Sequence, residues 1–450
     1  MSQWESLPDI LLEEIFCYLS IKQRYYCSLV CKRWNSIFYS ARVWRELRVK
    51  ERTFTYRRFN LYKGYQHEIS HHRVQMCLGT VGNMFRRIIM EPISDYYNLF
   101  EFIYVLSSYF EWFKDEGYPM PLLESFHFTF ACDTEGYNGH GDGLVLGTGG
   151  KILEELKRLL SNFRGLRELT LNNLLLETKD TLGLFEGFTQ HNRESLLFLE
   201  LVNLTKERCS LYHVVTFRNL TTVVMTLLQL TDDIVYMLAT RTAILDLVIT
   251  QDEYSAEAEV VAPSTWKKVR QKKPNLQVTL EVRGHCTKDF LLQPGAPVHS
   301  IVYKSAFLVL SPETMCYVSD LYMKTLENVV QLGLPRRLGK RAFSERADTY
   351  LVLLARQCPN LKRLVIRERL STATILILVS EGRKLRELSV RRNAILKKCD
   401  WPKASHWDDN FYRWLRVTAR NYDAVEKEIS HKMGGKWTMF SDKYFQKINY

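Results

Sequence analysis

Hydrophobic side chains in the first 48 residues recur three and four positions apart, which is the spacing of one face of an α-helix. Residues 6–9 read Ser-Leu-Pro-Asp and have the form of a helix start, because proline is tolerated in a first turn and the flanking serine and aspartate resemble a capping box. Ser20 followed by Gln23 predicts a second helix start. A third short element contains Val43, Trp44 and Leu47. The pattern therefore predicts a small bundle of short helices.

The apolar positions of these helices are large for so small a module. The first helix has its stripe at Leu11, Leu12, Ile15, Phe16 and Leu19, and the second has its stripe at Tyr26, Val30, Trp34 and Ile37. About 45 residues cannot enclose all of these side chains. Indole rings such as those of Trp34 and Trp44 are usually anchored in a core or in the pocket of a partner. We therefore expect an apolar surface that a second protein covers.

The residues that carry this pattern resemble the F-box family. The resemblance rests on residues 7–9 (Leu-Pro-Asp), on Ile15 and Leu19, on residues 30–34 (Val-Cys-Lys-Arg-Trp) and on residues 43–47 (Val-Trp-Arg-Glu-Leu). Ile10 stands where the family commonly has glutamate, and Val43 replaces a leucine; both changes keep the apolar face. The resemblance implies that a Skp-family adaptor contacts these side chains: Leu7, Pro8, Leu11, Ile15, Leu19, Val30, Trp34 and Trp44.

Beyond the first 50 residues, a short motif of the form L-x-x-L-x-L recurs. Clear copies begin at Leu166, Leu196, Ile244, Leu361 and Leu385, and weaker copies begin at Leu123, Leu220, Leu276, Val298 and Leu326. Successive copies start mostly 22 to 35 residues apart, with one larger gap after the copy at Leu123. Amphipathic stretches with helical spacing lie between them, at residues 151–163, 231–240, 347–358 and 372–381.

A strand followed by a helix at this period is typical of leucine-rich repeats, which stack because no single repeat can bury its own apolar face. The predicted fold class is therefore α/β: a three-helix F-box followed by an irregular leucine-rich-repeat solenoid, with parallel strands on the concave face and helices outside. An ordinary α/β domain with leucine in its strands is the alternative. F-box proteins often carry such repeats, so the resemblance favours the solenoid.

Four domains follow from these patterns. We expect an F-box at residues 1–48, a helical linker or amino-terminal cap at 49–120, degenerate repeats at 121–395, and a carboxy-terminal cap at 396–450. Within the linker, residues 96–115 have helical spacing; within the cap, residues 408–432 predict one helix that ends before Gly434 and Gly435.

Composition narrows the function classes only slightly. The net charge of +12 admits a nucleic-acid partner, but no block of five or six like charges occurs, so we expect basic residues spread over many faces and nucleic acid as an unlikely partner. No apolar run reaches the ~20 residues needed to span a bilayer, and we expect no membrane association. The ten cysteines are scattered, which predicts reduced thiols in a cytoplasmic or nuclear protein.

Candidate catalytic and metal-binding residues are weak. His67, His71 and His72 share a helical face in principle, but no spaced cysteine pair or glutamate completes a metal site. No nucleophile–base pair or dinucleotide fingerprint is recognisable. We therefore expect no catalytic residue, no metal and no cofactor.

The resemblance and the repeats together suggest a function. The chain is expected to be a non-catalytic substrate receptor of a Skp–cullin–F-box ubiquitin ligase, bound through its adaptor to a cullin–RING scaffold. Side chains that alternate with the core leucines would form the substrate surface, and the arginines at Arg363, Arg367 and Arg391 predict an acidic or phosphorylated protein substrate. A repeat scaffold without ligase activity is the alternative, and a nucleic-acid binder remains a second one.

Overall fold

The computed structural model describes residues 7–62, 64–117, 121–131, 147–255, 259–336 and 341–450. The chain divides into two compact units. The first consists of Met1–Val223 and Arg241–Ala243, and the second of Val224–Thr240 and Ile244–Tyr450.

The first unit begins with the helices α1 (Asp9–Tyr18), α2 (Ile21–Ser28) and α3 (Lys32–Phe38). The predicted capping box at Ser20 is confirmed, with both of its reciprocal hydrogen bonds to Gln23 present. The predicted start at Ser6 lies outside the described residues. Two details of the prediction were wrong. The second helix is interrupted at Cys31, which has an extended backbone and caps α3 with its thiol. The third element is a turn at residues 41–44, followed by a strand that begins at Glu46.

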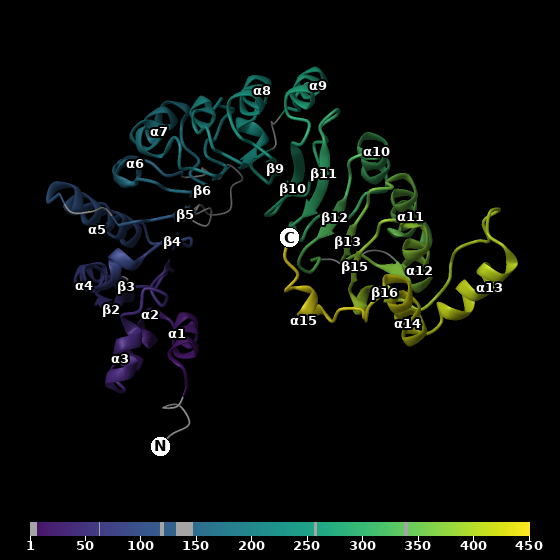
Figure 1. Ribbon diagram of the computed structural model, residues 1–450, viewed down its shortest axis with the longest axis horizontal. Helices are drawn as coiled ribbons and strands as arrows, with labels where there is room; N and C mark the ends of the chain where they lie inside the picture. Colours follow the sequence, from purple (N-terminus) through teal and green to yellow (C-terminus); the bar gives the residue numbers. More distant parts are fainter. Residues whose placement is uncertain (1–6, 63, 118–120, 132–146, 256–258, 337–340) are drawn as a thin grey trace. The chain divides into compact units, whose positions relative to one another are not determined.

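A parallel sheet follows in the first unit, and its strands pair in the order of the chain. They are β1 (Glu46–Val49), β4 (Arg87–Met90), β5 (Ser125–Thr129), β6 (Glu168–Asn172) and β7 (Phe198–Val202). The helices α5 (Tyr96–Asp115), α6 (Gly150–Asn162) and α7 (Thr178–Asn192) lie together on one side of these strands (Figure 1).

The predicted helical linker at residues 49–120 needs correction. It contains α4 (His71–Val81) and α5, but also β4 and an antiparallel hairpin of β2 (Thr55–Asn60) and β3 (Gly64–Ile69). The strands β1 and β4 have only four residues each and lack the repeat motif, so hydrophobic periodicity could not distinguish them from a helix end.

The second unit has the same kind of architecture. Its parallel strands again pair in chain order, and α8 (Asp232–Arg241), α9 (Pro263–Lys272), α10 (Pro312–Tyr322), α11 (Asp348–Gln357) and α12 (Thr372–Glu381) alternate with them. The strands are β9 (Asp246–Gln251), β10 (Gln277–Val282), β11 (Val298–Tyr303), β12 (Asn328–Gln331), β13 (Arg363–Ile366) and β15 (Glu387–Val390). Two shorter strands, β14 (Leu370–Ser371) and β16 (Ile395–Leu396), pair with each other. The division between the two units falls within β8 (Thr222–Thr226).

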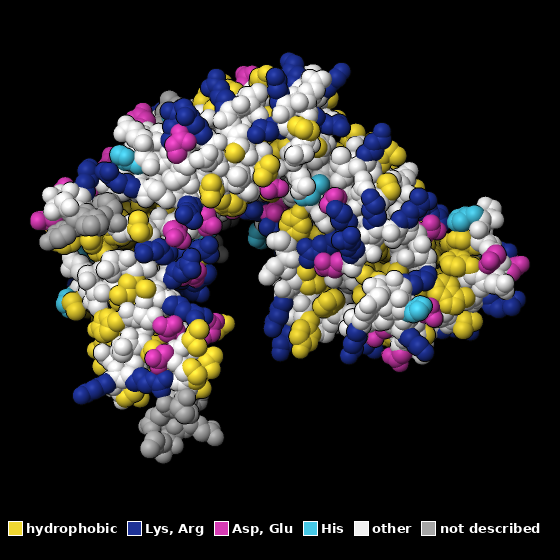
Figure 2. Space-filling model, viewed as in Figure 1, with side chains coloured by type: hydrophobic (Ala, Val, Ile, Leu, Met, Phe, Trp, Pro, Cys, Tyr) yellow, Lys and Arg dark blue, Asp and Glu magenta, His cyan; other side chains and the backbone are white. Residues whose placement is uncertain are grey.

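Each of the ten copies of the leucine motif coincides with a strand, so the period-two pattern is confirmed at every copy. The motif leucines supply the core: Leu169, Leu199 and Leu364 each have 0% of their surface exposed. Figure 2 shows basic side chains scattered over the visible surface of both units, as the interrupted charge runs predicted. Among the described residues, no helix combines the length and apolarity needed to cross a bilayer.

The chain ends with α13 (Asp409–Thr418), α14 (Tyr422–Met433) and the short α15 (Asp442–Phe445). The single helix predicted at residues 408–432 is therefore two helices, because Asn421 adopts an extended backbone and caps α14 with its side chain. The predicted stop at Gly434 is confirmed, since this glycine takes the left-handed conformation that ends the helix.

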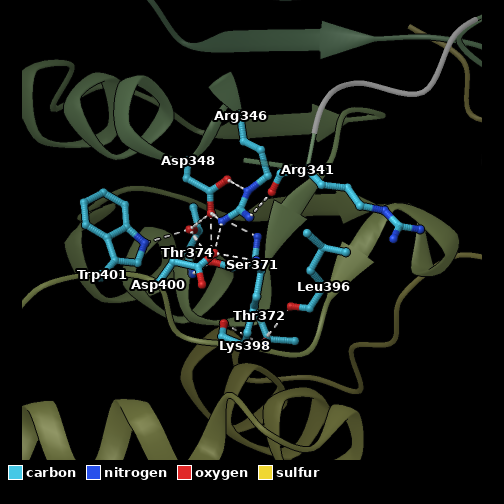
Figure 3. A network of polar contacts seen from close by, with 10 residues as sticks. All are labelled: Arg341, Arg346, Asp348, Ser371, Thr372, Thr374, Leu396, Lys398, Asp400 and Trp401. Atoms are coloured by element: carbon cyan, nitrogen blue, oxygen red, sulfur yellow. Dashed lines mark hydrogen bonds and ion pairs between the residues drawn. The ribbon is translucent and has the colours of Figure 1, made fainter. Parts of the chain in front are cut away.

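A buried ion pair fastens this terminal region to the strands and helices before it (Figure 3). The guanidinium of Arg346 donates to the Asp348 carboxylate at 2.8 Å, and both side chains are completely buried. Asp348 also accepts hydrogen bonds from the backbone and hydroxyl of Ser371 at the start of α12. Arg346 makes a second ion pair, at 2.6 Å, with Asp400, which precedes α13.

The replacement Asp348→Ala is expected to lower the unfolding free energy by about 3–5 kcal/mol, because it leaves a buried arginine with an incomplete partner set. Urea denaturation followed by circular dichroism measures the loss. The matched control is Glu381→Ala, which removes a partly exposed ion pair between Arg356 of α11 and Glu381 of α12. This replacement should cost less than about 1 kcal/mol. Equal losses in the two variants would contradict a special role for the buried pair.

Candidate functional site

The helix α1 has apolar side chains on two adjacent faces, and only one of them packs against the chain. On the inner face, Leu12 and Phe16 are each 1% exposed. The ring of Phe16 meets the edge of Trp34 from α3, with ring centroids 5.9 Å apart. On the outer face, Leu11 and Ile15 are 48% and 38% exposed. The first helix therefore presents an apolar face that no described part of the chain covers.

The neighbouring helices extend this exposed apolar set. Tyr18 at the end of α1 and Val30 after α2 are 82% and 64% exposed. We call the following residues the outer surface: Ile10, Leu11, Ile15, Tyr18, Tyr25, Tyr26, Leu29 and Val30. Figure 2 shows hydrophobic side chains gathered over α1. Exposed apolar side chains at this density are typical of a protein–protein contact surface.

A buried arginine on α2 holds the three helices in place. The guanidinium of Arg24 donates to the backbone oxygens of Phe16, Cys17 and Leu19 at the end of α1, and to that of Val43 at 2.7 Å. Burial lowers the pKa of Arg24, and the four carbonyl partners compensate for the lost solvation of its charge. Because Arg24 binds carbonyls at the end of α1 and also the Val43 carbonyl after α3, it fixes the direction in which α1 presents its outer face.

Surface ion pairs fix the ends of the same module. The Asp9 carboxylate at the start of α1 lies 2.7 Å from the Arg33 guanidinium of α3. Near the other end of α1, Glu14 pairs with Arg42 at 2.6 Å and Glu13 accepts a hydrogen bond from Ser40. These pairs are exposed and contribute little individually. Glu14 lies one helical turn from Ile10 and one from Tyr18, so its ion pair borders the apolar outer surface.

The expected adaptor contact at Trp44 needs correction. This side chain is 1% exposed, its ring packs edge-on against Phe38 at 5.1 Å, and it also contacts Phe85 and the Arg24 guanidinium. The indole N–H donates to the Phe38 carbonyl. Trp44 is therefore a core residue that joins the helical module to the following sheet, and its surface is not available to a partner.

The remaining seven residues expected at the adaptor are accessible to different degrees. Pro8, Leu11, Ile15 and Val30 are exposed, whereas Leu7, Leu19 and Trp34 are partly buried. Sequence reasoning missed Ile10, Tyr18, Tyr25, Tyr26 and Leu29 as part of the surface. The sequence of α1 contained the signal, because a small module cannot bury both apolar sides of one helix.

The arginines expected to receive a substrate are not open in this structure. Arg367 is 0% exposed, and its guanidinium donates to the carbonyl oxygens of Leu332, Ser305 and Leu308 at 2.6–2.8 Å. Burial lowers its pKa. The substrate role predicted for Arg367 is therefore wrong: the side chain joins three successive connections of the second unit.

Arg391 and Arg363 are occupied by the carboxy-terminal segment of the chain. Arg391 is 4% exposed and forms an ion pair of 2.9 Å with Asp442 of α15. Arg363 pairs with Glu387 at 2.9 Å, donates to the Asn449 carbonyl and lies over the Tyr450 ring. The prediction of a substrate surface at these two arginines needs the same correction, because the chain itself supplies their partners.

Two features of the described residues bear on catalysis and metal binding. In the described parts of the chain, no three histidine, cysteine or carboxylate side chains gather in a way that could hold a metal ion. Ser125 lies 2.7 Å from His127 Nε2, but Glu168 approaches that same nitrogen, at 3.7 Å. A hydrolase triad needs the base and the orienting carboxylate on different ring nitrogens, so this contact is not a triad.

The helical module with its apolar outer surface coincides with a known domain. The family model described as F-box domain matches residues 4–46. This span contains α1, α2 and α3, the Arg24 contacts and the whole outer surface. F-box domains bind Skp-family adaptors and typically belong to non-catalytic adaptor proteins. The chain thus carries an F-box domain at residues 4–46, which supports its assignment to the F-box proteins.

Proposed function

We propose that this chain is the substrate-recognition subunit of a Skp–cullin–F-box ubiquitin ligase. The observation that carries the proposal is the outer surface of the F-box domain, where Leu11, Ile15 and Val30 remain between 38% and 64% exposed although they are apolar. A Skp-family adaptor would cover these side chains and connect the chain to a cullin–RING scaffold. The ligase would act in the cytoplasm, the nucleus or both.

The contribution of such a subunit to the reaction is proximity. Bound at one end to the adaptor and at the other to a protein substrate, it would hold a substrate lysine near a ubiquitin-loaded conjugating enzyme. The thioester chemistry would take place on other subunits.

We also propose that each of the two units consists of irregular leucine-rich repeats stacked as in a solenoid, and that the F-box precedes the repeats of the first. In-order parallel pairing of strands separated by helices supports this proposal. So do two asparagines at successive strand ends, since Asn173 and Asn203 both have left-handed φ values of 61° and 53°. The Asn203 amide donates to Asn173 Oδ1 at 3.0 Å, as stacked repeat turns require. Repeats of this kind offer a broad surface for protein recognition.

The double replacement Leu11→Asp with Val30→Asp is expected to weaken adaptor binding at least about thirtyfold, because burying an unpaired carboxylate in an apolar contact removes a binding hot spot. Calorimetric titration of a purified Skp-family adaptor into the full chain measures the loss. Trp34→Ala with Leu7→Ala should act in the same direction.

The matched control is Leu61→Asp, a replacement at an apolar side chain that is 87% exposed and lies in the β2–β3 hairpin outside the domain. It should bind the adaptor as the unmodified chain does. Unchanged affinity in the double variant, with its circular dichroism spectrum intact, contradicts the assignment of the outer surface.

A second experiment separates the ligase from a scaffold without ligase activity. The first step identifies proteins that co-purify from cells with the unmodified chain and also with the Leu11→Asp, Val30→Asp variant. These partners bind outside the adaptor surface. If the chain is a ligase receptor, at least one of these partners should have a longer half-life when the variant replaces the unmodified chain. Unchanged half-lives for all of them, despite lost adaptor binding, would favour the scaffold.

A further inference from the structure

The face of the second unit's sheet that lies opposite α11 and α12 contains a row of valines. Val302, Val330 and Val365 occupy paired positions on the adjacent strands β11, β12 and β13. All three are 0% exposed, and the residue that buries them together is Phe445 of α15. Figure 1 shows α15 on the side of these strands away from α11 and α12. The row is therefore an apolar strip of the sheet face that the last residues of the chain cover, and we call this strip the groove.

The segment that fills the groove reaches it along the edge of the sheet. The backbone of Phe440 accepts from Arg392 and donates to Val390 at 2.9 Å, so it lies beside the end of β15 like one further strand residue. The indole of Trp437 donates to the Leu388 carbonyl. From this edge the chain turns into α15 and crosses the valine row. We call residues 441–450 the tail.

The tail contacts the sheet with a small set of specific groups. Asp442 accepts from Arg391 at 2.9 Å and from the Asn393 amide at 3.1 Å. Three residues later, Phe445 enters the valine row, and its neighbour Tyr444 is 62% exposed. Further along, Ile448 packs against the same cluster. The recognition elements are therefore one acidic group, one aromatic ring a helical turn later, and one aliphatic side chain three residues beyond the ring.

We propose that this groove is a peptide-binding site, and that the tail occupies it in competition with a partner segment of the same chemistry. The partner segment is an acidic residue followed three positions later by a large aromatic residue, presented as a single helical turn. An anchored ring and a paired carboxylate are typical of short-motif recognition. The identity of this segment as part of a substrate rests on the proposed function, whereas the peptide site itself does not.

The attachment of the tail makes such exchange physically reasonable. It is joined to α14 through Gly434, which has a φ of 71°, and Gly435, and its last residue, Tyr450, is 45% exposed. In the ion pair, the Asp442 side chain is 32% exposed and Arg391 is 5% exposed, so the tail supplies the accessible partner and the sheet supplies the buried one. Besides the Phe445 ring, the tail is held by Ile448 on the same cluster and by Arg363, which donates to the Asn449 carbonyl and lies over the Tyr450 ring. A segment that supplies an equivalent acid and an equivalent ring could replace these contacts.

The test measures binding of a fluorescent synthetic peptide with the sequence of residues 441–450 to the full chain by anisotropy. In the unmodified protein the tail should compete with the peptide. The variant Phe445→Ala removes the ring of the tail and leaves the groove unchanged, so it is expected to bind the peptide at least about tenfold more tightly. The matched control is Tyr444→Ala, which alters an exposed ring on the same short helix and should bind as weakly as the unmodified chain.

The peptide also carries its own controls. Peptides with the replacements Asp442→Lys or Phe445→Ala should bind the Phe445→Ala chain at least about tenfold more weakly than the natural sequence. Should that chain fail to fold, the full chain with Asp442→Lys takes its place, because this position lies at the surface. The proposal is overturned if the folded variants bind the peptide no better than Tyr444→Ala does, or if neither variant folds, since the tail would then be an inseparable part of the core. The assay contains no adaptor, so its outcome is independent of the adaptor titration.

Discussion

The first helix of this chain has two apolar faces, and the module around it has only one surface to cover them. Leu12 and Phe16 take the inner position against α3, which leaves Leu11 and Ile15 facing outward. The choice between the two faces is made by Arg24, whose guanidinium binds the carbonyl oxygens at the end of α1 and so sets the rotation of the helix. A rotation of α1 by about a quarter of a turn would instead bring Leu11 and Ile15 into the inner position. The proposed adaptor contact therefore depends on a hydrogen-bonded cation that is itself hidden.

The fold was predictable wherever the hydrophobic pattern extended over enough residues to define its period. All ten leucine motifs became strands, and the helix predicted at residues 96–115 coincides with α5. The strands β1 and β4 escaped because they lack the leucine motif that marked the equally short β12, β13 and β15, and two alternations alone also fit the end of a helix. Breaks inside helical patterns escaped for a different reason. Cys31 and Asn421 stop a helix by backbone conformation and capping, which apolar spacing does not record.

The apolar surface of the F-box domain was largely predictable from the sequence, whereas the roles of the arginines were much less so. Five arginines illustrate the difference. Arg24 and Arg367 are buried as multiple donors to backbone carbonyls, Arg346 is buried in an ion pair, and Arg363 and Arg391 have partners that come from the end of the chain. An arginine that alternates with core residues along a strand is equally consistent with all three outcomes, because its long side chain can reach any carbonyl that a neighbouring connection leaves unpaired. Sequence position alone therefore cannot separate a binding arginine from a structural one.

The carboxy-terminal segment shows why the prediction of a substrate surface failed where it did. A parallel sheet with helices on one face has an open edge and an open opposite face, and the row of Val302, Val330 and Val365 makes that face apolar. Residues near Phe440 cover the edge by pairing with β15, and Phe445 covers the face. The groups that meet there, Arg391 and Asp442, are 51 residues apart in the chain, so no local pattern connects them. A sheet face that is covered by its own chain and a sheet face that binds a partner have the same sequence pattern, since both are apolar rows beside a charged residue. They differ only in how strongly the covering segment is held.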